Sequence, residues 1–107
     1  MARTERELGD GALVLNLATQ FHEQLDGQTS AIEVALASRD AKAVVRHAHT
    51  LKGLLAMFHA EPARALAAAL EQAAKAEDWS AIELCWDALQ PELERVKPAL
   101  DAALAGA

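Results

Sequence analysis

Apolar residues in this chain recur at spacings of three and four positions in separate segments. The clearest run contains Ile82, Trp86, Leu89, Leu93, Val96, Leu100 and Leu104, and a second contains Val44, Ala48, Leu51, Leu55 and Phe58. Residues three and four apart lie on one face of an α-helix, so each run predicts a helix with one apolar face. Four such segments with short connections can bury their apolar faces against one another. We therefore predict an all-α fold, an antiparallel four-helix bundle.

The first helix is predicted over residues 10–37. Its apolar positions are Val14, Leu17, Phe21, Leu25, Ile32 and Leu36. Gln28 and Thr29 interrupt this stripe, and Gly27 is a point where the helix could kink or break. Residues 1–9 are polar and charged. We expect them to form a flexible N-terminal segment, with the bundle spanning residues 10–105.

Capping residues and prolines mark the other predicted helices. Asp40 is a plausible N-cap of the second helix, and Asp78 or Ser80 of the fourth. Glu61 and Pro62 open the third helix, whose inner face is predicted to contain Ala63, Leu66, Leu70 and Ala73. Pro91 and Pro98 fall inside the fourth segment. The apolar stripe keeps its phase across both prolines, so we expect a bent but continuous helix rather than a break.

Composition excludes several classes of protein. The chain has 107 residues, the size of one domain, and its single cysteine, Cys85, cannot form an internal disulfide. No apolar run approaches the roughly 20 residues that a membrane span requires. The net charge of −6 argues against a general nucleic-acid-binding protein, because phosphate backbones favour clustered Lys and Arg. We expect a cytoplasmic protein that neither inserts into membranes nor binds nucleic acid.

The segment with recognisable chemistry lies in the middle of the second helix. His49 is one position from Ala48 of the apolar stripe, which places it at the edge of that stripe and within reach of solvent. Its neighbours on the helix surface, three, four and seven positions away, are Lys42, Val45, Arg46, Lys52, Gly53 and Ala56. The basic residues suit a negatively charged group or partner. A neutral imidazole is a competent nucleophile, and phosphoryl transfer requires mainly positioning and charge stabilisation.

Gly53 requires a reason of its own. A glycine inside a helix costs about 1 kcal/mol relative to alanine. Beside an exposed histidine, a position without a side chain lets the backbone of another molecule come close. Gly53 therefore favours a docking surface around His49.

The run Ala48-His49-Thr50-Leu51-Lys52-Gly53 resembles the signature of the histidine-containing phosphotransfer domains of bacterial multistep phosphorelays. The resemblance extends to Asp40, Ala60, Leu66, and the pair Leu70-Glu71, and covers about residues 10–75. Leu54 and Leu55 stand where the family usually has small residues, and His59 stands where it usually has glycine. We expect these departures to alter which partner docks rather than to abolish transfer.

The resemblance implies a function for each of these residues. His49 would be the phosphoacceptor, Lys52 would lie beside the phosphoryl group, and Gly53 would open a docking surface that includes Lys42, Val45, Arg46 and Ala56. The partners would be receiver domains of a hybrid sensor histidine kinase, of a response regulator, or of both. The chain itself would need no cofactor and have no ATP-dependent kinase activity, since the magnesium used in transfer belongs to the receiver. We expect a monomer.

The sequence also allows other interpretations of its histidines and helices. A metal site is disfavoured because His47 and His49 point to different faces and no two histidines are four positions apart. We expect His47, His22 and His59 to be structural. A helical module that binds receivers without being phosphorylated is the main alternative. A dimerisation fragment of a histidine kinase is a weaker one, because it would need two chains to complete one bundle.

Overall fold

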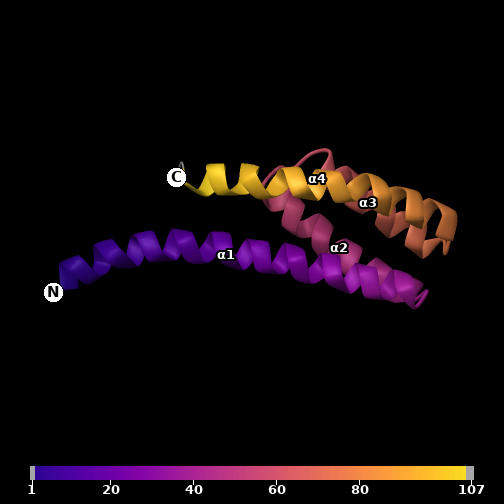
Figure 1. The fold of residues 1–107 in the computed structure, drawn as a ribbon, viewed down its shortest axis with the longest axis horizontal. Helices are drawn as coiled ribbons and strands as arrows, with labels where there is room; N and C mark the ends of the chain where they lie inside the picture. The colour runs from indigo at the N-terminus through magenta and orange to yellow at the C-terminus, as the bar shows by residue number, and fades with distance from the viewer. Residues whose placement is uncertain (1, 106–107) are drawn as a thin grey trace.

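The computed structural model describes residues 2–105 and, within them, the side chains of residues 19–102. Over this range the chain forms the helices α1 (Ala2–Ala37), α2 (Ala41–Met57), α3 (Ala63–Lys75) and α4 (Trp79–Ala105). Figure 1 shows the chain reversing at each connection, so that successive helices lie side by side. α1 packs against α2 and α4, and α3 packs against the same two helices. The prediction of an all-α helical bundle is confirmed.

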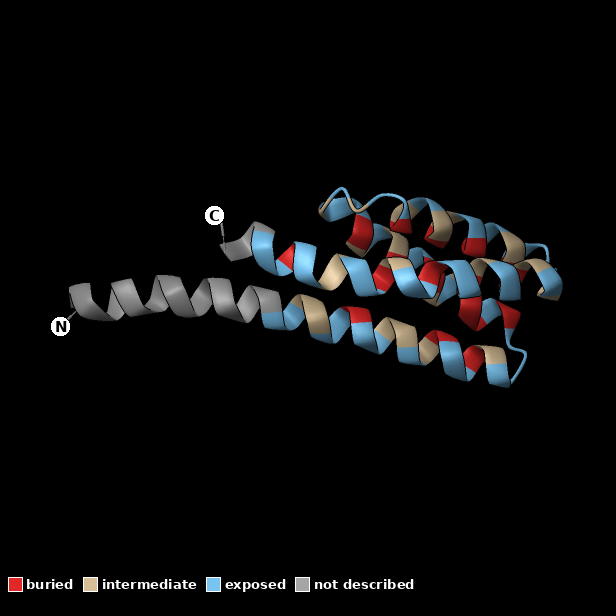
Figure 2. Cartoon of the chain, turned by 45° about the horizontal axis from the view of Figure 1, so that its top comes forward, coloured by how far each residue is buried: buried red, intermediate tan, exposed pale blue. Residues whose placement is uncertain are grey.

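One apolar core lies between the four helices. Its largest fully buried side chains are Ile32, Val44, Leu51, Leu55, Leu70, Ile82 and Leu89. The predicted stripes of α2 and α4 are confirmed, with Phe58 and Val96 half-buried at their margins. Figure 2 shows the buried positions on the helix faces that turn toward the neighbouring helices. The side chains of Val14, Leu17 and Leu104 lie outside the described residues.

α1 is a continuous helix that begins eight residues before the predicted start and ends at Ala37 as predicted. Gly27 does not break it. The half-buried Thr29 donates a hydrogen bond to the Leu25 carbonyl at 2.8 Å, and Gln28 bonds to a histidine of α2. Both polar residues are therefore satisfied within the bundle. The division into a flexible segment at residues 1–9 and a bundle over residues 10–105 stays a prediction.

The inner face of α3 differs from the predicted one. Besides Ala63 and Leu70, the buried positions are Ala67, Glu71 and Ala74, whereas the predicted Leu66 and Ala73 are only half-buried. The helix is thus rotated so that mostly methyl groups face the core. Small side chains allow two helix backbones to approach closely.

Two of the three connections use the same compact design. After α1 the Asp40 amide donates to the Ala35 carbonyl at 2.9 Å, and after α3 the Asp78 amide donates to the Ala73 carbonyl at 3.1 Å. Each aspartate then caps the next helix through its side chain, at 3.1 Å to the Ala43 amide and 3.2 Å to the Ala81 amide. In each connection, one aspartate therefore donates its amide to a carbonyl at the end of one helix and caps the start of the next helix with its carboxylate. Both predicted caps are confirmed, with Asp78 rather than Ser80 as the cap of α4.

α4 continues through Pro91 and Pro98, as predicted. Both prolines are exposed. A proline removes one backbone donor, and on an exposed face water can bond the carbonyl that loses its partner. Within residues 2–105, no helix is long and apolar enough to cross a membrane.

The left-handed backbone conformation of Glu77 predicts how a glycine at this position would change the free energy of unfolding. Glu77 has φ = 53° after α3, is exposed, and makes no ion pair with any residue whose side chain is described. Left-handed backbone costs a residue with a Cβ about 1 kcal/mol, and glycine far less. We expect Glu77→Gly to raise the free energy of unfolding by about 0.5–1 kcal/mol in urea titrations.

The control for this prediction is Glu77→Ala, which removes the same charge but keeps the Cβ. We expect Glu77→Ala to leave the free energy of unfolding near the native value. Equal stabilisation in both variants would assign the effect to charge rather than to the backbone.

Candidate functional site

His49 lies in the middle of α2, on the side that faces α3. The register of this helix is set by the Asp40 cap and by Ala48 and Leu51, which are fully buried. His49 lies between these two core positions, so its ring projects from the edge of the bundle. Its side chain is 67% exposed. The predicted accessibility of the imidazole is confirmed.

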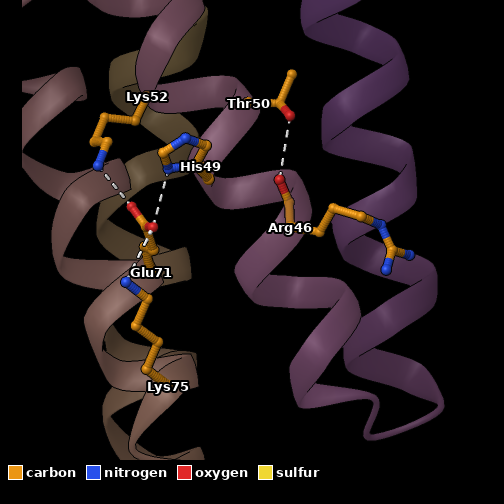
Figure 3. Close-up of polar contacts among 6 residues, drawn as sticks. All are labelled: Arg46, His49, Thr50, Lys52, Glu71 and Lys75. Carbon is orange, nitrogen blue, oxygen red and sulfur yellow. Dashed lines mark hydrogen bonds and ion pairs between the residues drawn. The ribbon is translucent and has the colours of Figure 1, made fainter.

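A buried carboxylate from α3 lies under this ring. Glu71 is 5% exposed, and its Oε2 lies 3.0 Å from Nδ1 of His49. Lys52, one turn further along α2, donates to Oε1 at 2.7 Å. Lys75, one turn further along α3, has its Nζ 3.5 Å from Oε2. Figure 3 shows His49, Lys52 and Lys75 gathered around this one carboxylate.

The charge of Glu71 follows from these contacts. The hydrogen bond from Lys52 is the largest cause that lowers the pKa of Glu71 to about 2 from its ordinary 4.5, and the bond to His49 and the charges of Lys52 and Lys75 add to it. Burial of the carboxyl opposes this shift. Glu71 is therefore ionised at neutral pH and cannot donate a hydrogen bond.

The ionised carboxylate determines which nitrogen of His49 can react. Because Glu71 can only accept, Nδ1 of His49 carries the proton and donates it to Oε2. In a neutral imidazole the lone pair is then on Nε2. Figure 3 shows Nδ1 directed at Glu71 and the other ring nitrogen directed away from it. The arrangement presents Nε2 as an accessible nucleophile held in one orientation.

The surface beyond His49 has little side-chain bulk. A Cβ built on Gly53 would meet nothing within 4 Å, and Gly53 and Ala56 are exposed while Val45 is half-buried. Met57, four positions after Gly53, is 67% exposed, which is unusual for a large apolar side chain. The backbone of α2 can therefore be approached closely at Gly53, with apolar groups beside it.

The three basic residues predicted around His49 do not act as one group. Lys52 is part of the Glu71 cluster, but Figure 3 shows the Arg46 side chain extending from α2 toward α1, away from the imidazole. Lys42 and Arg46 are exposed and have no ion-pair partner among the side chains of residues 19–102. Both remain available to an acidic partner.

The other histidines make structural contacts or lie apart from His49. Nδ1 of His47 bonds to Oε1 of Gln28 on α1 at 2.8 Å, on a different face of α2 from His49. Nε2 of His22 contacts Asp101 on α4 at 2.8 Å. His59 lies in the turn after α2 with φ = 53°, the left-handed region that favours glycine. The glycine that the family resemblance places at this position would adopt this conformation without strain.

Glu71 and Lys75 were not among the site residues predicted from sequence, and neither was Met57. Two signals pointed to Glu71: it belongs to the Leu70-Glu71 pair of the resemblance, and it precedes a lysine by four positions, the spacing of a helical ion pair. Helical spacing could have found Met57, because it lies four positions after Gly53 and outside the apolar stripe of α2.

Comparison with known proteins supports the interpretation of this geometry. The sequence model described as the Hpt domain matches residues 16–105. This match covers α2, α3 and α4 in full, together with most of α1. No curated protein and no solved structure matches the chain in the corresponding comparisons.

The lowered pKa of Glu71 predicts how stability depends on pH. A carboxyl whose pKa is lower in the folded state stabilises the fold above its ordinary pKa, and this stabilisation is lost as the pH falls through the folded pKa. We expect Glu71→Gln to lower the free energy of unfolding by roughly 1–2 kcal/mol at pH 7. The difference should shrink as the pH falls from 4.5 to about 2.

Urea titrations of the native protein and the Glu71→Gln variant between pH 7 and pH 2 measure this difference. A deficit of the same size at every pH would show that shape or hydrogen bonding, rather than ionisation of Glu71, is its source.

Proposed function

This chain belongs to the Hpt domain family, and on that premise we propose that it carries a phosphoryl group on Nε2 of His49 between receiver domains. The family supports a role in histidine phosphotransfer. The single observation that supports His49 as the carrier is its exposed ring, whose Nδ1 is held 3.0 Å from the ionised Glu71. That contact fixes both the orientation of the ring and the tautomer that leaves Nε2 free to attack.

In the proposed reaction, His49 accepts the phosphoryl group from an aspartyl phosphate of a receiver and passes it to an aspartate of another. The lone pair of Nε2 forms the N–P bond as the acyl phosphate O–P bond breaks, and the electrons of that bond return to the aspartate. Lys52 is the cation that would stabilise the developing charge, because it contacts the same carboxylate as His49, whereas the Arg46 side chain extends toward α1. The receiver supplies the magnesium ion, so this chain needs no cofactor for the step.

A docking face around His49 is part of the proposal. We define the docking face as Val45, His49, Gly53, Ala56 and Met57. Its centre is a glycine with open space above it, and its margin includes exposed apolar atoms. Lys42 and Arg46, at the start of α2, are free to pair with acidic groups of the partner. Receivers react through an aspartate, so the negatively charged pocket of the receiver would meet Lys42 and Arg46 at this end of the docking face.

The wider setting follows from the same premise. Hpt domains interact with receiver domains of kinases and of response regulators, and we propose both classes as partners in a cytoplasmic phosphorelay. The bundle core is formed by helices of one chain, so the proposal needs only a monomer. A dimerisation fragment of a kinase would need a second chain to complete its core.

The carrier role predicts the outcome of replacing His49. We expect His49→Gln to abolish labelling by a radiolabelled, phosphorylated receiver domain, because the amide has no nucleophilic ring nitrogen. The label on the native protein should be labile in acid and stable in base. His47→Gln is the matched control on the same helix, and we expect it to retain the label because His47 points toward α1.

Label that survives in His49→Gln would refute His49 as the carrier. If receivers bind the native protein without labelling it, the module that binds receivers without being phosphorylated becomes the better description.

The open space above Gly53 predicts that bulk there blocks docking without disturbing the fold. We expect Gly53→Leu to weaken binding of a receiver by about tenfold or more, since a large side chain would separate the two surfaces. Calorimetric titration of the receiver into each variant measures the affinity. Circular dichroism should show an intact fold, because nothing lies within 4 Å of the added Cβ.

Gly27→Leu is the matched control for this experiment. Gly27 is also an exposed glycine inside a helix with nothing within 4 Å of its Cβ position, but it belongs to α1 and lies outside the docking face. Equal loss of affinity in the two variants, or none in Gly53→Leu, would contradict the proposed docking face.

A further inference from the structure

Glu71 is paired with two lysines, although one would neutralise its charge. Lys52 donates to Oε1 at 2.7 Å, while the Nζ of Lys75 lies 3.5 Å from Oε2, the oxygen that also accepts from His49. The charged groups that contact this carboxylate, among the side chains the structure describes, come only from α2 and α3. The second lysine therefore calls for an explanation beyond neutralising the resting carboxylate.

The two lysines differ in where they lie relative to the imidazole. Lys52 shares α2 with His49 and is one helical turn away from it. Lys75 belongs to α3, and Figure 3 shows its side chain reaching Glu71 from the side away from the imidazole ring. A phosphoryl group on Nε2 would therefore lie within reach of Lys52, whereas Glu71 would lie between that group and Lys75.

Phosphorylation changes the competition for Lys52. A phosphoryl group on Nε2 adds up to two negative charges at the surface of α2. An ammonium on a flexible side chain can leave a carboxylate for a phosphoryl group close by. If Lys52 were the only lysine at Glu71, this move would take the hydrogen-bond donor from Oε1 and leave the phosphorylated ring as the one charged partner of a buried carboxylate, which is unfavourable.

We propose that Lys75 is a positioning residue that neutralises Glu71 when Lys52 moves to the phosphoryl group, so that Glu71 stays ionised and holds the proton on Nδ1 of His49 throughout the relay. This inference rests on the proposed function, since it concerns the phosphorylated state of His49. Lys75 touches neither the ring nor the phosphoryl group and acts through Glu71 alone.

The proton balance explains why an ionised Glu71 matters. When Nε2 forms the N–P bond, the proton stays on Nδ1, and the ring gains a positive charge that the carboxylate offsets. When the N–P bond breaks in onward transfer, its electrons return to Nε2 and the leaving group is a neutral imidazole. No proton enters or leaves at Nδ1 in either direction. A protonated Glu71 would not offset the ring charge and would lower the tendency of Nδ1 to keep its proton.

The test uses a small phosphoramidate as phosphoryl donor, so that no receiver needs to be identified. The readouts are the rate of phosphohistidine formation and the NMR signals of the lysine ammonium groups before and after phosphorylation. In the native protein we expect the Lys52 signal to shift on phosphorylation and the Lys75 signal to stay near its original position. Variants at position 75 then distinguish the proposed role of Lys75 from a purely structural one.

Variants at position 75 complete the experiment. In Lys75→Met we expect the Lys52 signal to remain near its resting position and phosphorylation to slow by about two- to fivefold, the size expected from losing one partly exposed ion pair. Lys75→Arg should restore both readouts. Arg64→Met, which removes another partly exposed, ion-paired cation of α3, is the matched control and should behave as the native protein.

Three results would overturn the inference. In the first, the Lys75→Met variant is phosphorylated at the native rate and its Lys52 signal shifts on phosphorylation as much as in the native protein. In the second, phosphorylation of the native protein shifts the Lys75 signal and not the Lys52 signal. Both leave the proposed function intact. Failure of phosphoramidate to label His49 in the native protein would overturn the proposed function, and this inference with it.

Discussion

The packing of α3 on α2 through small side chains determines where the site can form. Ala48 of α2 and Ala63, Ala67 and Ala74 of α3 are all buried in the apolar core, and α2 and α3 pack against each other. Methyl groups keep the two helix axes close, so the side chain of a glutamate on α3 can reach the edge of α2. A leucine-rich inner face would move α3 outward, and the 3.0 Å contact between Glu71 and His49 would be lost.

The buried carboxylate in turn requires charged partners near the surface. A fully enclosed ion pair gains little, because both charges lose their hydration. Here only Glu71 is enclosed, while Lys52 and Lys75 are 30% and 52% exposed and keep part of their water. The desolvation cost is therefore confined to one group, and the exposed imidazole receives a fixed hydrogen-bond acceptor from below. The same arrangement that stabilises the α2–α3 contact orients the nucleophile.

The sequence predicted α2 and its exposed histidine well because this helix has an unambiguous apolar stripe. Val44, Leu51 and Leu55 define one face, and Asp40 fixes the start, so the direction of His49 follows from 100° per residue. α3 is different, because alanine is compatible with either face and the two leucines alone did not determine the phase. Packing against α2 and α4 set its rotation and brought Glu71 inward. The predicted stripe had placed Glu71 beside the inner face rather than on it.

Arg46 shows a second limit of the same kind. Its position on α2, three residues before His49, is given by sequence, but the direction of a long side chain depends on the rotamer and on neighbouring helices. Figure 3 shows that this side chain turns toward α1. Helical spacing therefore predicted which residues share a surface, and only the packed structure separates those that converge on one carboxylate from those that do not.

Departures from the rules of helix packing locate the functional region more sharply than the histidine alone does. Glycine inside a helix and a carboxylate in an apolar face are both unfavourable for stability. Gly53 is one turn from His49, and Glu71 contacts its ring. Gly27 is also a glycine inside a helix, but it lies on α1 and, among the described side chains, is not accompanied by a buried charge or a nucleophile. The remaining irregular positions are exposed, where water or a turn tolerates them: Arg39, His59, Glu77, Pro91 and Pro98. Gly53 and Glu71 both lower stability and both lie next to one accessible nucleophile. Such residues are expected at a functional site, where a reaction with a second molecule requires them.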